Sequence, residues 1–159
     1  MVVLTSSENC MSSQRNERPQ LFTVERANLT LPYVRRIAED LAGLSSEIVE
    51  RRTALVHLME GRDVDSGDPY IEELAQVERE LEKDSDRLAE FINEIRALGA
   101  EPKNGPGGTI NLVDFPAMVD GEIVYLCWQL GEPEVRYWHH IEAGFAGRQL
   151  LKLEGSTAE

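Results

Sequence analysis

Residues 34–58 read VRRIAEDLAGLSSEIVERRTALVHL, and residues 74–98 read LAQVERELEKDSDRLAEFINEIRAL. In both stretches apolar residues recur at alternating steps of three and four, the spacing of the contact face of a coiled-coil helix. The stretches have equal lengths and a short connection, so they predict two helices folded into an antiparallel hairpin. The two apolar stripes consist of Val34, Ile37, Leu41, Leu44, Ile48, Leu55 and Leu58, and of Leu74, Val77, Leu81, Leu88, Phe91, Ile95 and Leu98.

One charged residue interrupts each stripe, Arg51 in the first and Asp84 in the second. The antiparallel alignment that puts Leu58 beside Leu74 also puts these two charges in neighbouring layers. Because a lone charge in an apolar seam is costly, we expect the two to pair and to fix the register of the hairpin. The alternative is two independent breaks in the seam, each turned toward solvent.

The two helices are expected over about 32–60 and 69–98. Pro32 and Pro69 each suit the first turn of a helix, where the missing N–H costs no hydrogen bond. Thr23 is expected to cap a separate short helical stretch before the first long helix. Together with this stretch, the hairpin is expected to occupy residues 21–100.

The connection between the helices contains DVDSGD, residues 63–68, which is similar to a calcium-binding loop. Its glycine falls one place early, and Leu74 stands where the bidentate glutamate of such a loop belongs. We therefore expect a solvated turn in which Asp68 caps the second helix.

A second apolar stripe flanks the first helix and needs its own cover. A two-helix hairpin has a single seam, and the C-terminal module can reach only the base of the hairpin. The uncovered tip predicts a homodimer or a protein partner that binds through the helical arm. The second stripe consists of Ala38, Ala42, Ser45, Val49, Val56 and Met59, and Tyr70 and Ile71 lie across the tip from its end.

Residues 101–151 predict a small antiparallel β-meander, so the fold class is α+β. Residues 102–108 are rich in glycine and proline and are expected to form a linker. The first strand is expected to break at residues 114–116, and Asp120-Gly121 is a strong hairpin signal. Strands are expected at 110–113, 123–128 and 135–139.

The 159-residue chain has a net charge of −13, which disfavours nucleic acid and anionic membranes as partners. The N-terminal tail, residues 1–20, is polar and is expected to be disordered, and residues 152–159 to be flexible. Cys10 and Cys127 form no metal or disulfide motif, so reduced thiols and a cytoplasmic location are expected. Cys127 lies in an apolar strand pattern, where a thiol is usually inert.

Several short stretches look familiar together: LFTVERAN at 21–28, LVDFPA at 112–117, CWQLGE at 127–132, YWH at 137–139 and AGFAGR at 143–148. In this combination the chain resembles the bacterial family called domain of unknown function 2203 (DUF2203), over about residues 21–151. The resemblance implies no established activity. Function must therefore be argued from the residues themselves.

The segment HHIE, residues 139–142, is the best cluster of potential metal ligands. Adjacent histidines point to opposite faces of a strand, so His140 would join Glu142 if the segment is extended, and His139 if it is helical. Zinc needs three or four ligands, so Asp114 or Asp120 would have to be recruited. His140 also departs from the acidic residue usual in the resembled family. We expect no metal site and no cofactor.

The segment GFAGR, residues 144–148, would present backbone N–H groups and Arg148 to an anion. The alternative, which we favour, is a tight turn in which Phe145 fills the core and Arg148 pairs with an acidic neighbour. The aromatic residues of the meander are expected to be mainly core. Candidate binding residues are Trp128, Tyr137, Trp138 and Arg148.

The leading hypothesis is a small acidic binding protein that acts through its helical hairpin, in oligomerisation or in a protein contact. The alternative is an enzyme, dependent on a small molecule or a metal, with its site where the meander meets the helices. There His139 would act as acid or base and Arg148 as anion anchor, with Glu142 and Asp114 beside them.

Overall fold

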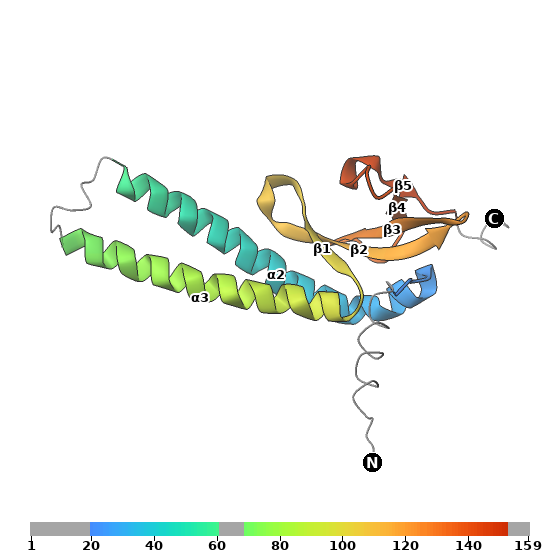
Figure 1. Cartoon of the computed structure of the whole chain (residues 1–159), viewed down its shortest axis with the longest axis horizontal. Helices are drawn as coiled ribbons and strands as arrows, with labels where there is room; N and C mark the ends of the chain where they lie inside the picture. Colours follow the sequence, from blue (N-terminus) through green and yellow to red (C-terminus); the bar gives the residue numbers. More distant parts are fainter. Residues whose placement is uncertain (1–19, 61–68, 153–159) are drawn as a thin grey trace, which may run out of the picture.

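The computed structural model describes residues 20–60 and 69–152. Two long helices, α2 (Val24–Met59) and α3 (Pro69–Ala97), are followed by a five-stranded antiparallel sheet (Figure 1). The predicted α+β class and the helical hairpin are confirmed. The expected solvated turn with Asp68 as helix cap and nearly all of the two expected tails lie outside the described residues. Within the described ranges, neither helix is long and apolar enough to span a bilayer.

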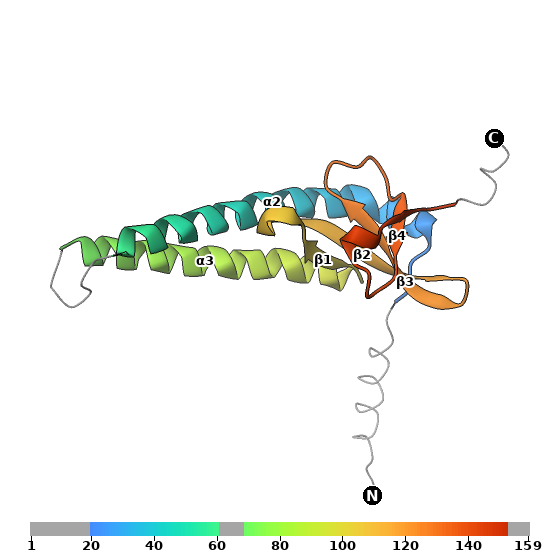
Figure 2. The ribbon, with the colours of Figure 1, turned by 90° about the horizontal axis from the view of Figure 1, so that it is seen from above.

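Helix α3 lies beside α2 except at the first turns of α2, which continue past the end of α3, and the distal halves of both helices extend well beyond the sheet (Figures 1 and 2). Arg51 and Asp84 form an ion pair across the seam, as the alignment of the stripes predicts. At the distal end Met59 packs into the seam, whereas Leu58 is about half exposed. An α-helix drifts relative to a strict seven-residue repeat, which explains this one-residue shift. The buried distal seam consists of Leu44, Ile48, Leu55, Leu74 and Leu81.

The prediction that the first long helix begins near residue 32 is wrong, since α2 begins at Val24. Thr23 caps this longer helix, and its hydroxyl accepts a hydrogen bond from the Arg26 N–H at 3.1 Å. Pro32 lies inside the helix with its ring exposed. Losing one helical hydrogen bond there is offset by packing, because Ala27 and other residues of the first turns are buried in the core.

The strands pair in chain order, and the turn at Asp120-Gly121 forms the predicted β2–β3 hairpin. The expected linker at 102–108 instead contains β1, and β2 runs without a break through residues 114–116. Proline is tolerated there because β1 pairs only with the first half of β2, so Pro116 lies at an edge. The strands are β1 (Glu101–Asn104), β2 (Ile110–Val119), β3 (Glu122–Gln129), β4 (Tyr137–His139) and β5 (Gln149–Leu150).

The third predicted strand is shorter than expected, because β4 begins at Tyr137 rather than at residue 135. The Val135 N–H donates instead to the Asn28 side-chain oxygen of α2, at 2.7 Å. A second hydrogen bond joins the residues just before the helix to the sheet, where the Phe22 N–H donates to the Pro116 carbonyl at 2.7 Å. These contacts tie the base of the hairpin to the sheet.

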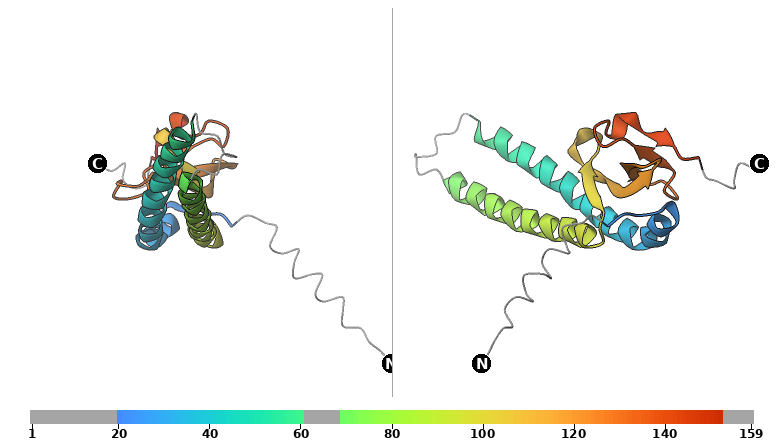
Figure 3. Two further views of the ribbon diagram at one scale, coloured as in Figure 1. Left: turned by 90° about the vertical axis from the view of Figure 1, so that its left-hand side faces the viewer. Right: turned by 45° about the vertical axis from the view of Figure 1, so that its right-hand side comes forward.

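One face of the sheet packs against the base of the hairpin and forms the main core (Figure 3). Phe115 and Trp128 are fully buried there, and Phe115 meets Phe22 edge to face. Ser45 marks the distal end of this contact. Its hydroxyl accepts a hydrogen bond from the Ile110 N–H at 3.0 Å and donates to the Ala42 carbonyl. The described hairpin beyond Ser45 forms the arm.

The ion pair in the seam yields a prediction about the stability of the arm. Replacing Arg51 with leucine leaves the half-buried Asp84 carboxylate without its main partner, so we expect a loss of about 1–3 kcal/mol in the free energy of unfolding. Asp84→Leu should behave similarly, and the double variant should recover part of the loss. Urea denaturation of all four proteins gives the coupling energy. If each single leucine variant is as stable as the double variant, the pair does not set the register.

Candidate functional site

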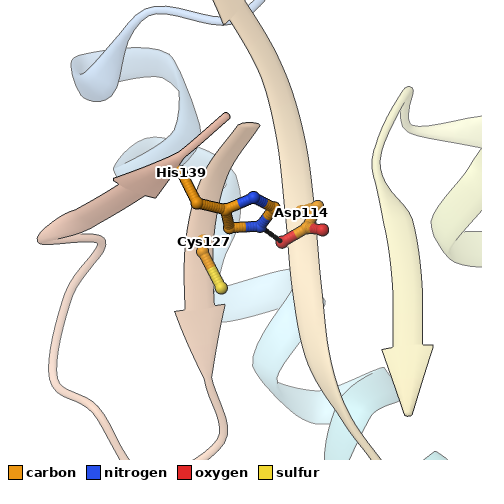
Figure 4. Close-up of side chains that lie close together, drawn as sticks. All are labelled: Asp114, Cys127 and His139. Carbon is orange, nitrogen blue, oxygen red and sulfur yellow. Dashed lines mark hydrogen bonds and ion pairs between the residues drawn. The ribbon is translucent and has the colours of Figure 1, made fainter. Parts of the chain in front are cut away.

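Three polar or titratable side chains from neighbouring strands gather in the interior of the sheet (Figure 4). Asp114 of β2 lies directly opposite Cys127 of β3, and Cys127 lies opposite Tyr137 of β4. His139, two residues beyond Tyr137, therefore shares their face of the sheet. Each of these three side chains belongs to a residue that is 1 or 2% exposed. Their potential ligand atoms all lie within 4.8 Å of one another.

This cluster lies on the opposite face of the sheet from the helices. Val113 and Phe115, the neighbours of Asp114 in β2, both belong to the core that packs on α2. Side chains alternate between the two faces of a strand, so Asp114 points away from the helices. The site is thus built by the sheet alone, and the helices support it from behind.

The hydrogen bonds of His139 determine which of its nitrogens carries a proton. Nδ1 lies 2.8 Å from the carbonyl oxygen of His140, which can only accept, so Nδ1 carries the hydrogen. In a neutral ring Nε2 is then an acceptor, and it faces Asp114 Oδ1 at 3.3 Å. Two acceptors at this distance repel each other. A proton or another cation between these two atoms would satisfy both.

The second oxygen of Asp114 already has a cationic partner. Lys103 of β1 places its Nζ 3.3 Å from Asp114 Oδ2. The same ammonium lies 4.7 Å from the centre of the Tyr125 ring, a favourable cation–π contact. Lys103 is partly exposed, so this side of the cluster is the one closest to solvent. Lys103 balances the negative charge of Asp114 at Oδ2, and His139 faces the other oxygen, Oδ1.

Cys127 is not a nucleophile in this arrangement. Burial raises the pKa of its thiol to about 12, and the negative charge of Asp114 acts in the same direction. A thiol with this pKa is protonated at neutral pH, and the thiolate is the reactive form. His139 cannot activate it as a base, since one ring nitrogen faces a carbonyl and the other faces Asp114. The three residues do not form a catalytic triad.

Arg148 lies in a second cluster, where its charge is already compensated. Its Nη2 is 2.7 Å from both carboxylate oxygens of Glu132, and its guanidinium lies 4.0 Å from the centre of the Tyr137 ring. The Glu132 carboxylate also accepts a hydrogen bond from the Gln129 N–H at 2.8 Å. Phe145 flanks the guanidinium at 4.9 Å and is half-buried outside the core, so the expectation that it fills the core is wrong. The tight turn with an acidic partner thus describes this segment better than an open anion site.

The structure brings together only part of the predicted site. His139 and Asp114 meet, whereas Glu142 is exposed and Arg148 is paired elsewhere. His140 faces outward and lies 3.1 Å from a carboxylate oxygen of Glu122. The candidate ligand set of His139, His140 and Glu142 is therefore not assembled. Adjacent histidines on an extended segment face opposite sides, as the geometry of strands requires.

The candidate aromatic binding residues also separate in the structure. Trp128 is fully buried in the core, and its Nε1 donates to the carbonyl of Glu132 at 2.9 Å. Trp138 is half-buried and meets the His140 ring edge to face, with centroids 4.9 Å apart. Tyr137 is half-buried beside Arg148. A shared aromatic platform therefore does not form.

Sequence reasoning missed Cys127 as a member of the cluster, although a signal was present. Asp120-Gly121 predicts a two-residue hairpin turn, and counting outward from it pairs Asp114 with Cys127. Directly opposed residues share a face, so the pair would have been placed together. The expected break at residues 114–116 prevented that step.

The arm exposes apolar residues on α2. Val49 is 44% exposed and Val56 is 63% exposed. Their separation of seven residues places them on one line of the helix, away from the seam. The two helices also differ in charge: α2 carries five acidic and five basic residues (lysine and arginine), whereas α3 carries nine acidic and four basic ones.

The fold and these sites define a class of small α+β proteins in which a helical hairpin supports a curved antiparallel sheet. Comparison with known families identifies the group. The chain matches the family described as uncharacterized conserved protein (DUF2203) over residues 20–151, and it belongs to that family. No curated protein and no solved structure matches the chain.

Proposed function

We propose that the protein acts by binding, and that its arm pairs with the arm of a second copy of the chain. The observation that carries this proposal is the exposed apolar line of Val49 and Val56 on a hairpin that extends past the sheet (Figure 1). Apolar residues in line along a helix are typical of a helix–helix contact. The single seam of the hairpin is already filled by its own leucines and isoleucines.

The charges of the two helices favour a second copy as the occupant. The neutral α2 carries Arg52 in the arm outside the Arg51–Asp84 pair, and the strongly acidic α3 of the other copy would lie beside it in an antiparallel pair. Contacts between α2 of one copy and α3 of the other would relieve the repulsion within α3, whereas contacts between two α3 helices would increase it. The described arm of α2 offers about four helical turns for such a contact.

A cytoplasmic location is part of this proposal. Cys127 is a free thiol in the structure, and free thiols suit a reducing compartment. The acidic character of the chain disfavours nucleic acid or anionic lipid as the occupant of the arm. The apolar line of Val49 and Val56 therefore favours a protein surface as the partner.

The oligomeric state of the full chain tests the proposal. We expect the mass measured by light scattering to be that of a dimer, and the double variant Val49→Glu/Val56→Glu to be a monomer, because a buried glutamate pair opposes the contact. The matched control is Met118→Glu/Ile123→Glu, which places the same charges on exposed apolar residues at the β2–β3 hairpin. The control should remain a dimer.

Two results would contradict the proposal. One is a wild-type chain that is monomeric at the highest concentration measured. The other is a dimer that persists in the arm variant. Far-UV circular dichroism should show that the helical content of each variant equals that of the wild type, so that a change in mass reports on the interface and not on folding.

A further inference from the structure

His139 and Asp114 form a buried pair on the face of the sheet that points away from the helices. Nδ1 of the imidazole donates to the His140 carbonyl, which leaves the Nε2 lone pair directed at Asp114 Oδ1 at 3.3 Å. The same arrangement is found around metal-bound histidines, whose second nitrogen usually donates to a carbonyl or carboxylate. The lone pair and the carboxylate oxygen thus converge on one point that requires positive charge.

A third donor atom lies beside this point. The sulfur of Cys127 is within 4.8 Å of the other two donor atoms and belongs to the same face of the sheet (Figure 4). The donor set consists of one nitrogen, one oxygen and one sulfur, held on three adjacent strands. From this convergence we infer that Asp114, Cys127 and His139 bind one divalent transition-metal ion of the zinc class.

The chemistry of the donor set selects the class of ion. Thiolate and imidazole favour zinc, cobalt or iron over magnesium and calcium, which prefer oxygen donors. A neutral imidazole, a thiolate and a carboxylate together balance the two positive charges of the ion. Donor atoms around a tetrahedral zinc lie about 3–4 Å apart, so a cluster whose donor atoms lie within 4.8 Å of one another needs only a small adjustment. A fourth position remains for water.

Neighbouring groups hold the donors in orientation. The His140 carbonyl fixes the tautomer and the plane of the His139 ring, and Lys103 holds Asp114 through Oδ2. Such supporting contacts are typical of metal sites. Binding displaces the thiol proton of Cys127 and any proton held between His139 and Asp114, and both pass to the solvent buffer.

Titration of the full-length chain with cobalt tests the inference, after treatment with a chelator. We expect one cobalt ion per chain, with visible absorption bands of tetrahedral cobalt and a near-ultraviolet band from thiolate to cobalt. Zinc should bleach these bands by competition. The titration is performed on Cys10→Ser, so that Cys127 is the sole thiol able to produce the near-ultraviolet band.

Two variants test whether cobalt binds through Cys127 or through a neighbouring residue outside the cluster. Cys127→Ala should remove the near-ultraviolet band and weaken cobalt binding by at least about tenfold. The control His140→Gln changes a neighbouring histidine that faces Glu122, and it should leave both the band and the affinity unchanged. Far-UV circular dichroism checks that each variant is folded.

The inference is overturned if the Cys10→Ser chain binds no cobalt, if the band survives Cys127→Ala, or if binding is lost with His140→Gln. If Cys127→Ala fails to fold, Cys127→Ser replaces it, since serine fits the same space. Metal-dependent thermal stability gives an independent measurement on the unmodified chain. Its melting temperature should rise with added zinc if the site binds, and an unchanged temperature contradicts the inference.

Discussion

Replacing Trp128 with alanine is expected to lower the free energy of unfolding by about 3–5 kcal/mol. The side chain is fully buried between the sheet and α2. Its loss leaves a large cavity and removes the hydrogen bond from Nε1 to the Glu132 carbonyl. It also removes the ring that faces the guanidinium of Arg35 at 5.8 Å. Urea denaturation monitored by circular dichroism measures the change.

Trp138 provides the matched control, because it is half-buried and meets an exposed histidine edge to face. Its replacement by alanine should cost clearly less than that of Trp128. Equal losses for the two variants would mean that Trp128 is not the central residue of the core. Since Trp128 was a candidate binding residue, a stable Trp128→Ala protein would also reopen a binding role for it.

Replacing Arg148 with methionine is expected to cost about 2–4 kcal/mol of the free energy of unfolding. Methionine keeps much of the length of the side chain, so the main loss is the charge beside the partly buried Glu132. The carboxylate would retain the Gln129 N–H but lose its cation. A second change, Glu132→Gln, should restore part of the loss in the double variant, because no uncompensated charge remains.

A second arginine–glutamate pair on the surface provides the control for Arg148. Arg136 and Glu134 are 3.0 Å apart, and both side chains are about half exposed. Because solvent screens such a pair, Arg136→Met should cost no more than about 1 kcal/mol. If Arg148→Met costs equally little, the Arg148–Glu132 pair contributes only as a surface pair, and Arg148 is again a candidate for anion binding.

The helical hairpin was predictable because its signal is repeated along the chain. Fourteen apolar positions follow one spacing, and the charges at Arg51 and Asp84 agree with the alignment that those positions give. The expected start of the first helix was based on one residue, Pro32, and that prediction was wrong. Pro32 can lie inside a helix when its ring faces solvent and the preceding turn is buried by the sheet. That burial is a tertiary effect, which local sequence does not contain.

The sheet and the buried cluster were less predictable for a related reason. Short strands such as β1 and β5 depend on their neighbours for pairing, so proline and glycine near them suggest loops. The buried cluster forms because β2, β3 and β4 pair in the register that brings its three side chains together. Asp114 and His139 were recognised as reactive residue types, but their meeting with Cys127 follows from pairing across the sheet. Chemistry that arises from register is visible in sequence only after the hairpin turn has been used to align the strands.

The location of the Arg51–Asp84 contact beyond the sheet constrains how the length of this chain can change during evolution. Gaining or losing seven residues in α2 moves every later residue along the axis by about 10 Å, so α3 must change by the same amount. An unmatched change between the sheet and this contact would separate the two charges and leave each facing leucines. Insertions and deletions in that part of the arm are therefore expected as compensating pairs, one in each helix, while the segments that touch the sheet keep a constant length.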